Sequence, residues 1–189
     1  MDAIQLMMEE HKYILRGLKV FRAMSLAVLR EDSVDFEAFE TMISFVRNYA
    51  DKHHHNKEES ILFKIMEEKM GEDKVKGPLS GMYIEHDMGR LYMKTLEEAL
   101  NRVKAGDFDS KVDIIANAIC YADLLNRHIE KEDKLIYNFA RRSLDQEDMK
   151  SVDERCEKVE AEASAKGIQS SYLKKLEELE KKYVLKAGE

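Results

Sequence analysis

The sequence predicts an all-α protein: an antiparallel up-down-up-down four-helix bundle followed by a C-terminal helical extension. Charged residues make up 37% of the 189 positions, and there are only eight glycines and one proline, a composition typical of helical soluble proteins. Apolar residues also recur at helical spacing in four long segments. The connections between these segments span roughly 5–10 residues, which favours antiparallel neighbours.

Each long segment is bounded by residues that begin or end helices. The apolar stripes cover residues 3–29, about 35–70, about 79–105 and about 111–143. The clearest interruption runs from Gly71 to Pro78, because glycine suits a helix end and proline suits the first helical turn. Ser110 and Asp113 resemble a capping pair at the start of the last segment.

The character of the sequence changes after Leu144. Residues 145–166 and 170–186 are rich in lysine and glutamate, and each carries only a thin apolar stripe. Such runs usually form a solvated helical face, so we assign no chemistry to them. We expect a bundle domain over residues 1–144 and a charged helical extension over residues 145–189 that packs on it.

Composition also limits the partners. A formal net charge of -7 gives no reason to expect nucleic acid or an anionic membrane surface. No apolar run approaches the ~20 residues of a membrane span, and the N-terminus lacks a secretory signal. Cys120 and Cys156 form no Cys-x-x-Cys pair. These features favour a cytoplasmic protein, as a monomer or a dimer, that contacts neither nucleic acid nor membrane.

Two stretches of the predicted bundle match position for position, one from His54 and one from His128. In each, a lysine lies three residues after the histidine, an adjacent acidic pair follows, and an apolar triplet closes the stretch. Residues four apart lie on the same face of a helix, so the side chains of His54 and Glu58 can point at one spot, as can those of His128 and Glu132. We interpret the two stretches as halves of one metal site.

Two further histidines lie at the same level on the neighbouring helices. With a rise of ~1.5 Å per residue, His11 lies about 27 Å before the first turn, and His54 lies about as far after it. His86 and His128 are related in the same way in the second half of the chain. Six polar residues on four helices should therefore converge in one layer: His11, His54, Glu58, His86, His128 and Glu132.

Such a layer needs compensating charge. Two buried carboxylates without partners would each cost several kcal/mol or take up protons, and two divalent cations would remove that penalty. Imidazole and carboxylate ligands without thiolate suit iron, manganese or zinc. We therefore predict a pair of metal ions, with iron favoured and manganese or zinc as substitutes.

Several neighbouring residues keep alternative interpretations. A single His-x-x-x-Glu on a helix is usually a surface ion pair, and it is the duplication that favours metal binding. The alternative ligand pair on this helix is His55 with Glu59, although Ile129 occupies the position equivalent to His55 in the second stretch. If His54 and Glu58 are the ligands, His55 and Glu59 are expected to hydrogen-bond to ligands rather than to the metal. His53 is expected to face solvent. Tyr121 lies close enough in sequence to approach the site, but core packing is the expectation.

These residues resemble the hemerythrin-like, HHE cation-binding domain family over about residues 3–142. The family pattern, a histidine and a His-x-x-x-Glu in each half, falls on the six residues named above. The phrase His-His-Asn-Lys-Glu-Glu at residues 54–59 is also similar to the family's. The resemblance implies a non-heme, oxo- or hydroxo-bridged di-iron centre in a four-helix bundle. Family roles include reversible O2 binding, oxygen or iron sensing, and handling of nitric oxide or peroxide.

The sequence departs from the oxygen-carrying hemerythrins in the third helix. Those proteins place two histidines four apart there, whereas Met82 and Arg90 flank His86 at that spacing. One iron would then be a histidine short, or would take a replacement ligand. The last carboxylate, Glu132, also lies four residues after its histidine rather than five.

We predict a di-iron protein that binds O2 or a related small diatomic or peroxide species, in oxygen or redox sensing or handling. The alternative is a di-iron redox enzyme that is peroxidase-like, catalase-like or reduces nitric oxide. Ferritin-like iron storage is disfavoured because no histidine has a glutamate three positions before it. A purely structural bundle would require the metal to be absent.

Overall fold

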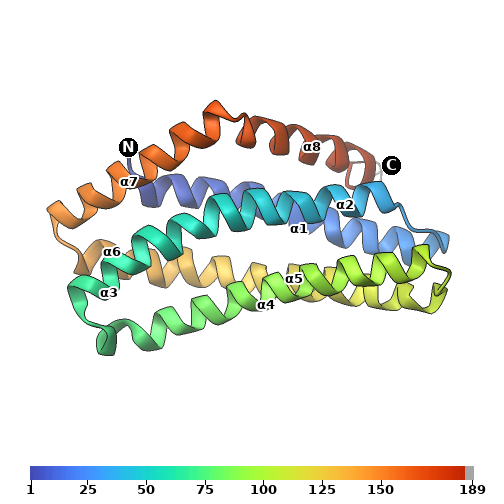
Figure 1. The fold of residues 1–189 in the computed structure, drawn as a ribbon, viewed down its shortest axis with the longest axis horizontal. Helices are drawn as coiled ribbons and strands as arrows, with labels where there is room; N and C mark the ends of the chain where they lie inside the picture. The colour runs from blue at the N-terminus through green and yellow to red at the C-terminus, as the bar shows by residue number, and fades with distance from the viewer. Residues whose placement is uncertain (186–189) are drawn as a thin grey trace.

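The computed structural model describes residues 1–185, and their side chains except those of Glu72 and Lys74. These residues form helices joined by short connections, which confirms the prediction of an all-α protein (Figure 1). No strand occurs among residues 1–185. Residues 186–189, the end of the predicted extension, lie outside the described part of the chain.

The helical segments follow one another in the order expected from the sequence. The first is α1, Ala3–Glu31. The second runs through α2 (Phe36–Phe45), the π-helices η1 (Val46–His55) and η2 (Glu58–Phe63), and α3 (Lys64–Met70). The third is α4, Glu72–Lys104. A 3₁₀ turn, η3 (Phe108–Ser110), leads to the fourth, which consists of α5 (Lys111–Lys131), the π-helix η4 (Glu132–Ile136) and α6 (Tyr137–Ser143). The extension contains α7 (Gln146–Ala165) and α8 (Ile168–Tyr183).

The turn between the second and third segments is tighter than the sequence suggests. Only Gly71 separates the helices, so α4 begins at Glu72 rather than near residue 79, and Pro78 lies inside it. Gly71 has φ 81° and ψ 140°, a conformation that glycine adopts without the steric cost of a Cβ atom. A single residue can therefore make this turn, and the proline removes one backbone hydrogen bond from a long helix.

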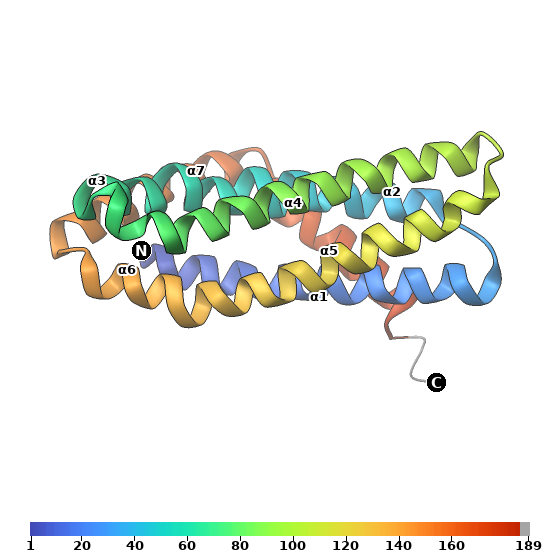
Figure 2. The ribbon, with the colours of Figure 1, turned by 90° about the horizontal axis from the view of Figure 1, so that it is seen from below.

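The long segments lie side by side along the molecule, and the chain turns back at each connection between them (Figures 1 and 2). α5 packs against both α1 and α4. Buried apolar side chains form two clusters, one that includes Phe39 and Leu96 and another that includes Met7 and Leu62. Along each segment the buried histidines and glutamates fall between these clusters. A polar layer is thus enclosed by apolar packing on both sides.

The extension contributes to the core of the protein. α7 and α8 lie across α1 and the second segment (Figure 1). Four of its apolar side chains are buried in the two clusters: Val152, Cys156, Leu176 and Leu179. Arg16 of α1 donates to both carboxylate oxygens of Glu180, with the shorter contact at 2.5 Å. No helix within residues 1–185 combines the length and apolar character that crossing a membrane requires.

Asp145 is expected to stabilise the start of α7. Its side chain accepts hydrogen bonds from the backbone N–H groups of Glu147 and Asp148, each at 2.9 Å. Asp145→Ala should lower the free energy of unfolding by about 1 kcal/mol, the usual cost of losing an N-cap aspartate, in a urea titration. Gln146→Ala is the matched control and should change it by less than about 0.5 kcal/mol. Equal effects of the two substitutions would contradict the capping role.

Candidate metal centre

Three of the four long segments supply the first set of converging side chains. His11 comes from α1 and His54 from η1, while Glu58 and Glu132 are the first residues of η2 and η4. One potential ligand atom of each residue lies within 4.8 Å of those of the others, and all four residues are buried. We call this set the first ligand group.

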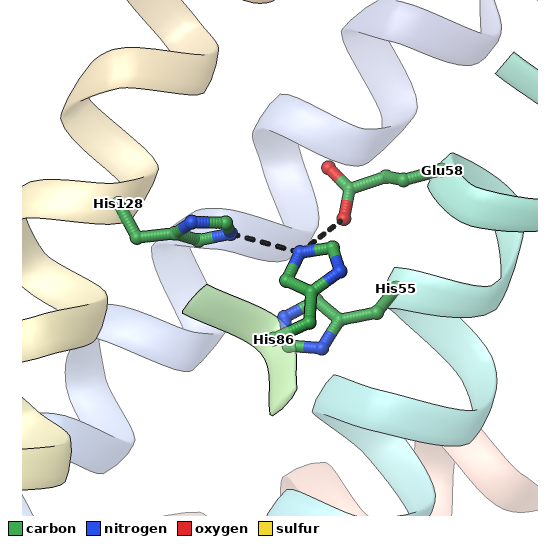
Figure 3. Close-up of side chains that lie close together, drawn as sticks. All are labelled: His55, Glu58, His86 and His128. Atoms are coloured by element: carbon green, nitrogen blue, oxygen red, sulfur yellow. Dashed lines mark hydrogen bonds and ion pairs between the residues drawn. The ribbon is translucent and has the colours of Figure 1, made fainter. Parts of the chain in front are cut away.

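A second ligand group lies beside it and consists of His55, Glu58, His86 and His128 (Figure 3). All four residues are buried, and their potential ligand atoms also lie within 4.8 Å of one another. The Nε2 atoms of His86 and His128 are 3.0 Å apart. The ring of His55 stacks on that of His86, with centroids 4.0 Å apart and planes 12° apart. Glu58 belongs to both groups.

The two carboxylates connect the groups. Glu58 Oε1 lies 3.6 Å from Nε2 of His54, and Glu58 Oε2 lies 3.6 Å from Nε2 of His86. Glu132 Oε2 lies 3.1 Å from Nε2 of His128 and 3.3 Å from Nε2 of His11. Each carboxylate therefore faces imidazoles of both groups. This is the arrangement that two adjacent cations would need from bridging ligands.

The other nitrogen of each imidazole faces a carboxylate. The Nδ1 contacts of four histidines are His11 with Asp133 at 2.7 Å, His54 with Glu10 at 2.8 Å, His86 with Glu59 at 2.6 Å and His128 with Glu85 at 2.9 Å. His55 Nδ1 lies farther away, 3.5 Å from Asp51. An ionised carboxylate only accepts, so Nδ1 donates in each bond. Because Nδ1 is occupied in this way, Nε2 is the nitrogen that would bind a metal ion, an orientation common in metal sites.

The supporting carboxylates repeat as the histidines do, and the sequence reasoning missed three of them. Glu10 and Glu85 each come directly before a histidine of the site, and each bonds the histidine of the facing stretch. Asp133 directly follows Glu132, as Glu59 follows Glu58, and both bond the histidine of another helix. The Glu-His dipeptide in both halves was the signal that could have identified Glu10 and Glu85.

Tyr137 is a further residue that the sequence reasoning did not single out. Its hydroxyl donates to Glu58 Oε1 at 2.5 Å, and its ring stacks on His11 with centroids 5.6 Å apart. Phe63 holds the equivalent place in the first stretch and stacks on His86. Tyr137 is fully enclosed, and burial raises the pKa of its hydroxyl well above 10, so this group stays protonated. It therefore holds one oxygen of a shared carboxylate in place.

Buried oxygens and a nitrogen without hydrogen-bond partners show that the residues fit a cation. These atoms are His54 Nε2, Glu58 Oε2 and both carboxylate oxygens of Glu132. An unsatisfied buried polar group costs about 1–3 kcal/mol, and more when it is charged. Bound cations would accept electron pairs from all of these atoms. The donor set of imidazole and carboxylate, without thiolate, suits iron, manganese or zinc.

The titration of the buried groups divides them into two sets. Despite their burial, hydrogen bonds and charges of the neighbouring carboxylates raise the pKa of His11 and His86 to about 9 and that of His128 to about 10, so bound cations would replace protons on these imidazoles. Burial raises the pKa of Glu58 to about 8, and the charge of Glu132 adds to this effect. Burial also lowers the pKa of His54 to about 4 and that of His55 well below its usual value. The two histidines are therefore neutral near pH 7, which is the form that binds metals. The raised value for Glu58 reflects two carboxylates enclosed together, which a cation would relieve.

The structure brings together all six residues that the sequence indicated, and it changes the expectation for two neighbours. His53 does not face solvent: it is 3% exposed, because α7 covers this side of η1. His55 does not pair with Glu59, which instead bonds His86 and Arg90. His55 lies among the potential ligands of the second group. Glu59 lies outside that group and, as expected, supports it, because it accepts a hydrogen bond from Nδ1 of His86.

The π-helical backbone helps to explain the position of His55. η1 contains all three consecutive histidines, and a π-helix is wider than an α-helix, with i→i+5 hydrogen bonds. Consecutive side chains then diverge less around the axis, so His54 and His55 can both point inward. The expectation from an α-helical period left room for only one of them on the inner face. π-helical turns of this kind are frequent at functional sites.

A cavity of about 240 Å³ adjoins the second ligand group. Its wall includes the imidazoles of His55 and His86 together with Val46, Met93 and Tyr121. Tyr121 is 1% exposed, and its hydroxyl has no hydrogen-bond partner among the described residues. Tyr121 thus belongs to the core, as expected, but it also lines the space beside the site. A small molecule could reach the second ligand group through this cavity.

Comparison with known proteins supports a cation-binding role. The sequence matches the family model described as "Hemerythrin HHE cation binding domain" over residues 2–140. This match covers about three quarters of the chain and includes every residue of both ligand groups. Comparisons with curated proteins and with solved structures returned no significant match.

Proposed function

The chain belongs to the hemerythrin HHE cation-binding family, and from this premise we propose that it holds two iron ions and binds O2 or a related small diatomic or peroxide species. One ion would be held by His11 and His54, and the other by His55, His86 and His128. Glu58 and Glu132 would be shared between them. Manganese or zinc would fit the same donors.

One observation carries this proposal. Four of the five imidazoles are fixed by a carboxylate on Nδ1, while their Nε2 atoms converge on two buried carboxylates with unpartnered oxygens. A structural ion-pair network would satisfy those oxygens with donors. Here the bonds around the site orient lone pairs toward an enclosed space instead, and this is the expected support for metal ligands.

The surrounding chain favours small ligands and the exclusion of water. Bound iron would supply reversible redox chemistry, and the residues of the chain would determine what reaches it. The apolar clusters on both sides keep bulk water from the polar layer. The cavity beside His55 and His86 has room for a diatomic molecule or a peroxide. The Tyr121 hydroxyl is available there to donate a hydrogen bond to such a ligand.

His55 bears on the choice between reversible binding and turnover. The sequence lacks the second histidine that oxygen carriers place on the third helix, which would leave one iron more open. In the structure the imidazole of His55 stacks on His86 within the second ligand group. We propose that it replaces the missing ligand, and this favours reversible binding in sensing or handling over a redox enzyme.

The four long segments are proposed to form the antiparallel up-down-up-down bundle expected from the sequence, with residues 1–144 as its domain. The short connections and the shared polar layer support this arrangement. A cytoplasmic location remains a prediction from the sequence, as do the monomeric or dimeric state and the lack of a nucleic-acid partner.

Anaerobic reduction followed by exposure to O2 tests the proposed function. Optical and Mössbauer spectra of the iron-loaded protein should show a ligand-bound form that returns to the reduced form when O2 is removed. Repeated cycles should give the same spectra. Immediate and permanent oxidation, with consumption of peroxide or nitric oxide, would instead support the di-iron enzyme. A protein that binds no iron would overturn both.

Tyr121→Phe should alter ligand release without altering metal content. If the hydroxyl donates to the bound ligand, its loss removes a hydrogen bond worth about 0.5–1.5 kcal/mol, and O2 should dissociate roughly 2–10 times faster. Stopped-flow measurement of O2 release checks this. Tyr92→Phe, a partly buried tyrosine that does not line the cavity, is the matched control. Equal release rates for wild type and Tyr121→Phe would contradict a contact with the ligand.

A further inference from the structure

A second buried polar cluster lies beside the first ligand group and includes a residue of the C-terminal extension. Its members are Glu10 of α1, His53 and Lys57 of the second segment, and Glu160 of α7. The Lys57 ammonium is fully buried and donates to carboxylate oxygens of both Glu10 and Glu160. His53 Nε2 lies 2.9 Å from Glu10 and 3.2 Å from Glu160.

The cluster already contains its cation. Without Lys57, the side chains of Glu10, His53 and Glu160 would have a spacing that suits metal ligands. The Lys57 ammonium, however, is bonded to the same oxygen of each carboxylate that faces His53. A buried ammonium is stable only when carboxylates surround it in this way. We therefore assign the cluster a role in holding side chains in place rather than a third metal ion.

This cluster connects α7 to a proposed metal ligand. Glu10 uses Oε1 for Lys57 and His53, and it uses Oε2 to accept from His54 Nδ1 at 2.8 Å. The path from Glu160 through Lys57 and Glu10 to His54 is continuous. Glu160 lies beyond residues 2–140, the part of the chain that matches the family model. The extension is thus connected to the site by hydrogen bonds as well as by apolar packing.

The internal repeat of the chain provides a comparison. Glu85, Lys131 and His128 are related to one another as Glu10, Lys57 and His54 are: Glu85 accepts from both His128 Nδ1 and Lys131. Among residues 1–185, no hydrogen bond or ion pair joins the extension to Glu85 or Lys131, and the Lys131 side chain is 39% exposed. The Lys57 side chain is 0% exposed. The extension therefore encloses one half of a duplicated support and leaves the other half to solvent.

We propose that Glu160 is a positioning residue for the metal centre: through Lys57 and Glu10 it fixes the ring of His54 and so secures the ion in the first ligand group. This proposal rests on the proposed metal binding. Glu160 shares the Lys57 ammonium with Glu10, which leaves Oε2 of Glu10 free for His54. Without Glu160, the Lys57 ammonium would bond to Glu10 alone or turn toward solvent. Either movement would shift the Glu10 carboxylate and disturb its hydrogen bond to His54.

The test is the release of iron from the full-length, iron-loaded protein to a chelator. In Glu160→Gln, one of the two ions should leave roughly tenfold faster, within the range seen for loss of outer-shell support, and the other should leave at the wild-type rate. Mössbauer spectra should show one altered iron environment of the two. Glu157→Gln removes an exposed carboxylate from the same helix and should change neither property.

The equivalent lysines give a second comparison. Lys57→Met should accelerate the release of one ion, whereas Lys131→Met should have a smaller effect because Lys131 is partly solvated. Glu160→Asp keeps the negative charge, so it should release the affected iron ion much more slowly than Glu160→Gln does. If Glu160→Gln does not fold, Glu160→Asp measured against Glu157→Asp carries the same comparison. Glu160→Asp should then release one ion faster than wild type, by less than tenfold, and Glu157→Asp should release both at the wild-type rate.

Two results would overturn the proposal, and they differ from a failure of the proposed function. If both ions leave Glu160→Gln at wild-type rates, or both leave equally faster, Glu160 does not position His54, and metal binding stands. If the wild-type protein binds no iron, the proposed function itself is wrong and the positioning role falls with it.

Discussion

Glu58→Gln is expected to abolish the binding of both metal ions. Glu58 is the one residue common to the two ligand groups, and its two oxygens face His54 and His86. The amide has nearly the same shape but lacks the negative charge and presents an N–H₂ group to the site. Elemental analysis after anaerobic loading with Fe(II) should fall from about two ions per chain to about zero, since a site that has lost a charged ligand has lost most of its binding free energy.

The stability of the metal-free protein separates this effect from a failure to fold. Without metal, Glu58 is a buried carboxylate crowded against Glu132, so its replacement by a neutral amide should leave the metal-free protein as stable as wild type or more so. Glu68→Gln, at an exposed position on the same segment, is the matched control and should retain both ions. Full metal content in Glu58→Gln would contradict the shared role of this carboxylate.

His55→Ala should give a different result from Glu58→Gln in the same assay. His55 belongs only to the second ligand group, so its loss should weaken the binding of one ion and leave the other ion bound. Equal metal content in wild type and His55→Ala would mean that this imidazole only packs against His86.

Removing the metal ions is expected to lower the melting temperature by about 15–30 °C. A ligand present at 1,000 times its dissociation constant stabilises the folded state by about 4 kcal/mol, so two ions contribute about 8 kcal/mol. A chain of this length shifts by roughly 2–4 °C per kcal/mol. Calorimetry of the iron-loaded protein with and without excess chelator measures the shift. The physical origin is the polar layer, whose buried carboxylates the bound cations would neutralise.

Glu58→Gln again supplies the control for this experiment. Because the variant should bind no metal, chelator should leave its melting temperature unchanged. A wild-type protein whose melting temperature does not respond to chelator or to added iron would show that the polar layer is stable on its own. The structural bundle would then be the better description.

The helical fold and the residues of the polar layer follow from patterns that lie within short stretches of sequence. The 3.6-residue period predicts the helices, and the two matching stretches from His54 and His128 identify their ligand pairs. In an antiparallel hairpin, the rise of ~1.5 Å per residue brings His11 to the level of His54, and His86 to the level of His128. The structure brings these residues together in one buried layer, and their assignment as metal ligands stays a prediction. Their convergence could be predicted because it depends on local geometry and on a duplication, in which each half can be checked against the other.

The remaining features depend on contacts between distant parts of the chain. The burial of His53 and Lys57 requires α7, which lies about a hundred positions further on. No helical period within residues 53–57 indicates that a glutamate at position 160 will cover them. The sequence therefore led us to expect that His53 faces solvent, and the charged composition of the extension gave no sign that one of its glutamates would be bonded to Lys57.

The position of His55 was missed for a different reason. Equivalence with Ile129 implied that the two halves of the site use the same positions, and the α-helical period placed His55 away from His54. The π-helical backbone of η1 alters that period, and the second group gains an imidazole that the first group lacks. Repeats predict what the halves share, and they do not predict where one half has diverged.

X-ray absorption of the iron-loaded protein tests the central claim most directly, because it reports whether two metal ions lie side by side. The proposed site predicts about two irons per chain, a first shell of nitrogen and oxygen atoms without sulfur, and an iron–iron distance of about 3.5–4 Å or shorter. A protein that takes up no iron, or isolated iron without an iron neighbour, would contradict a dinuclear centre built on Glu58 and Glu132.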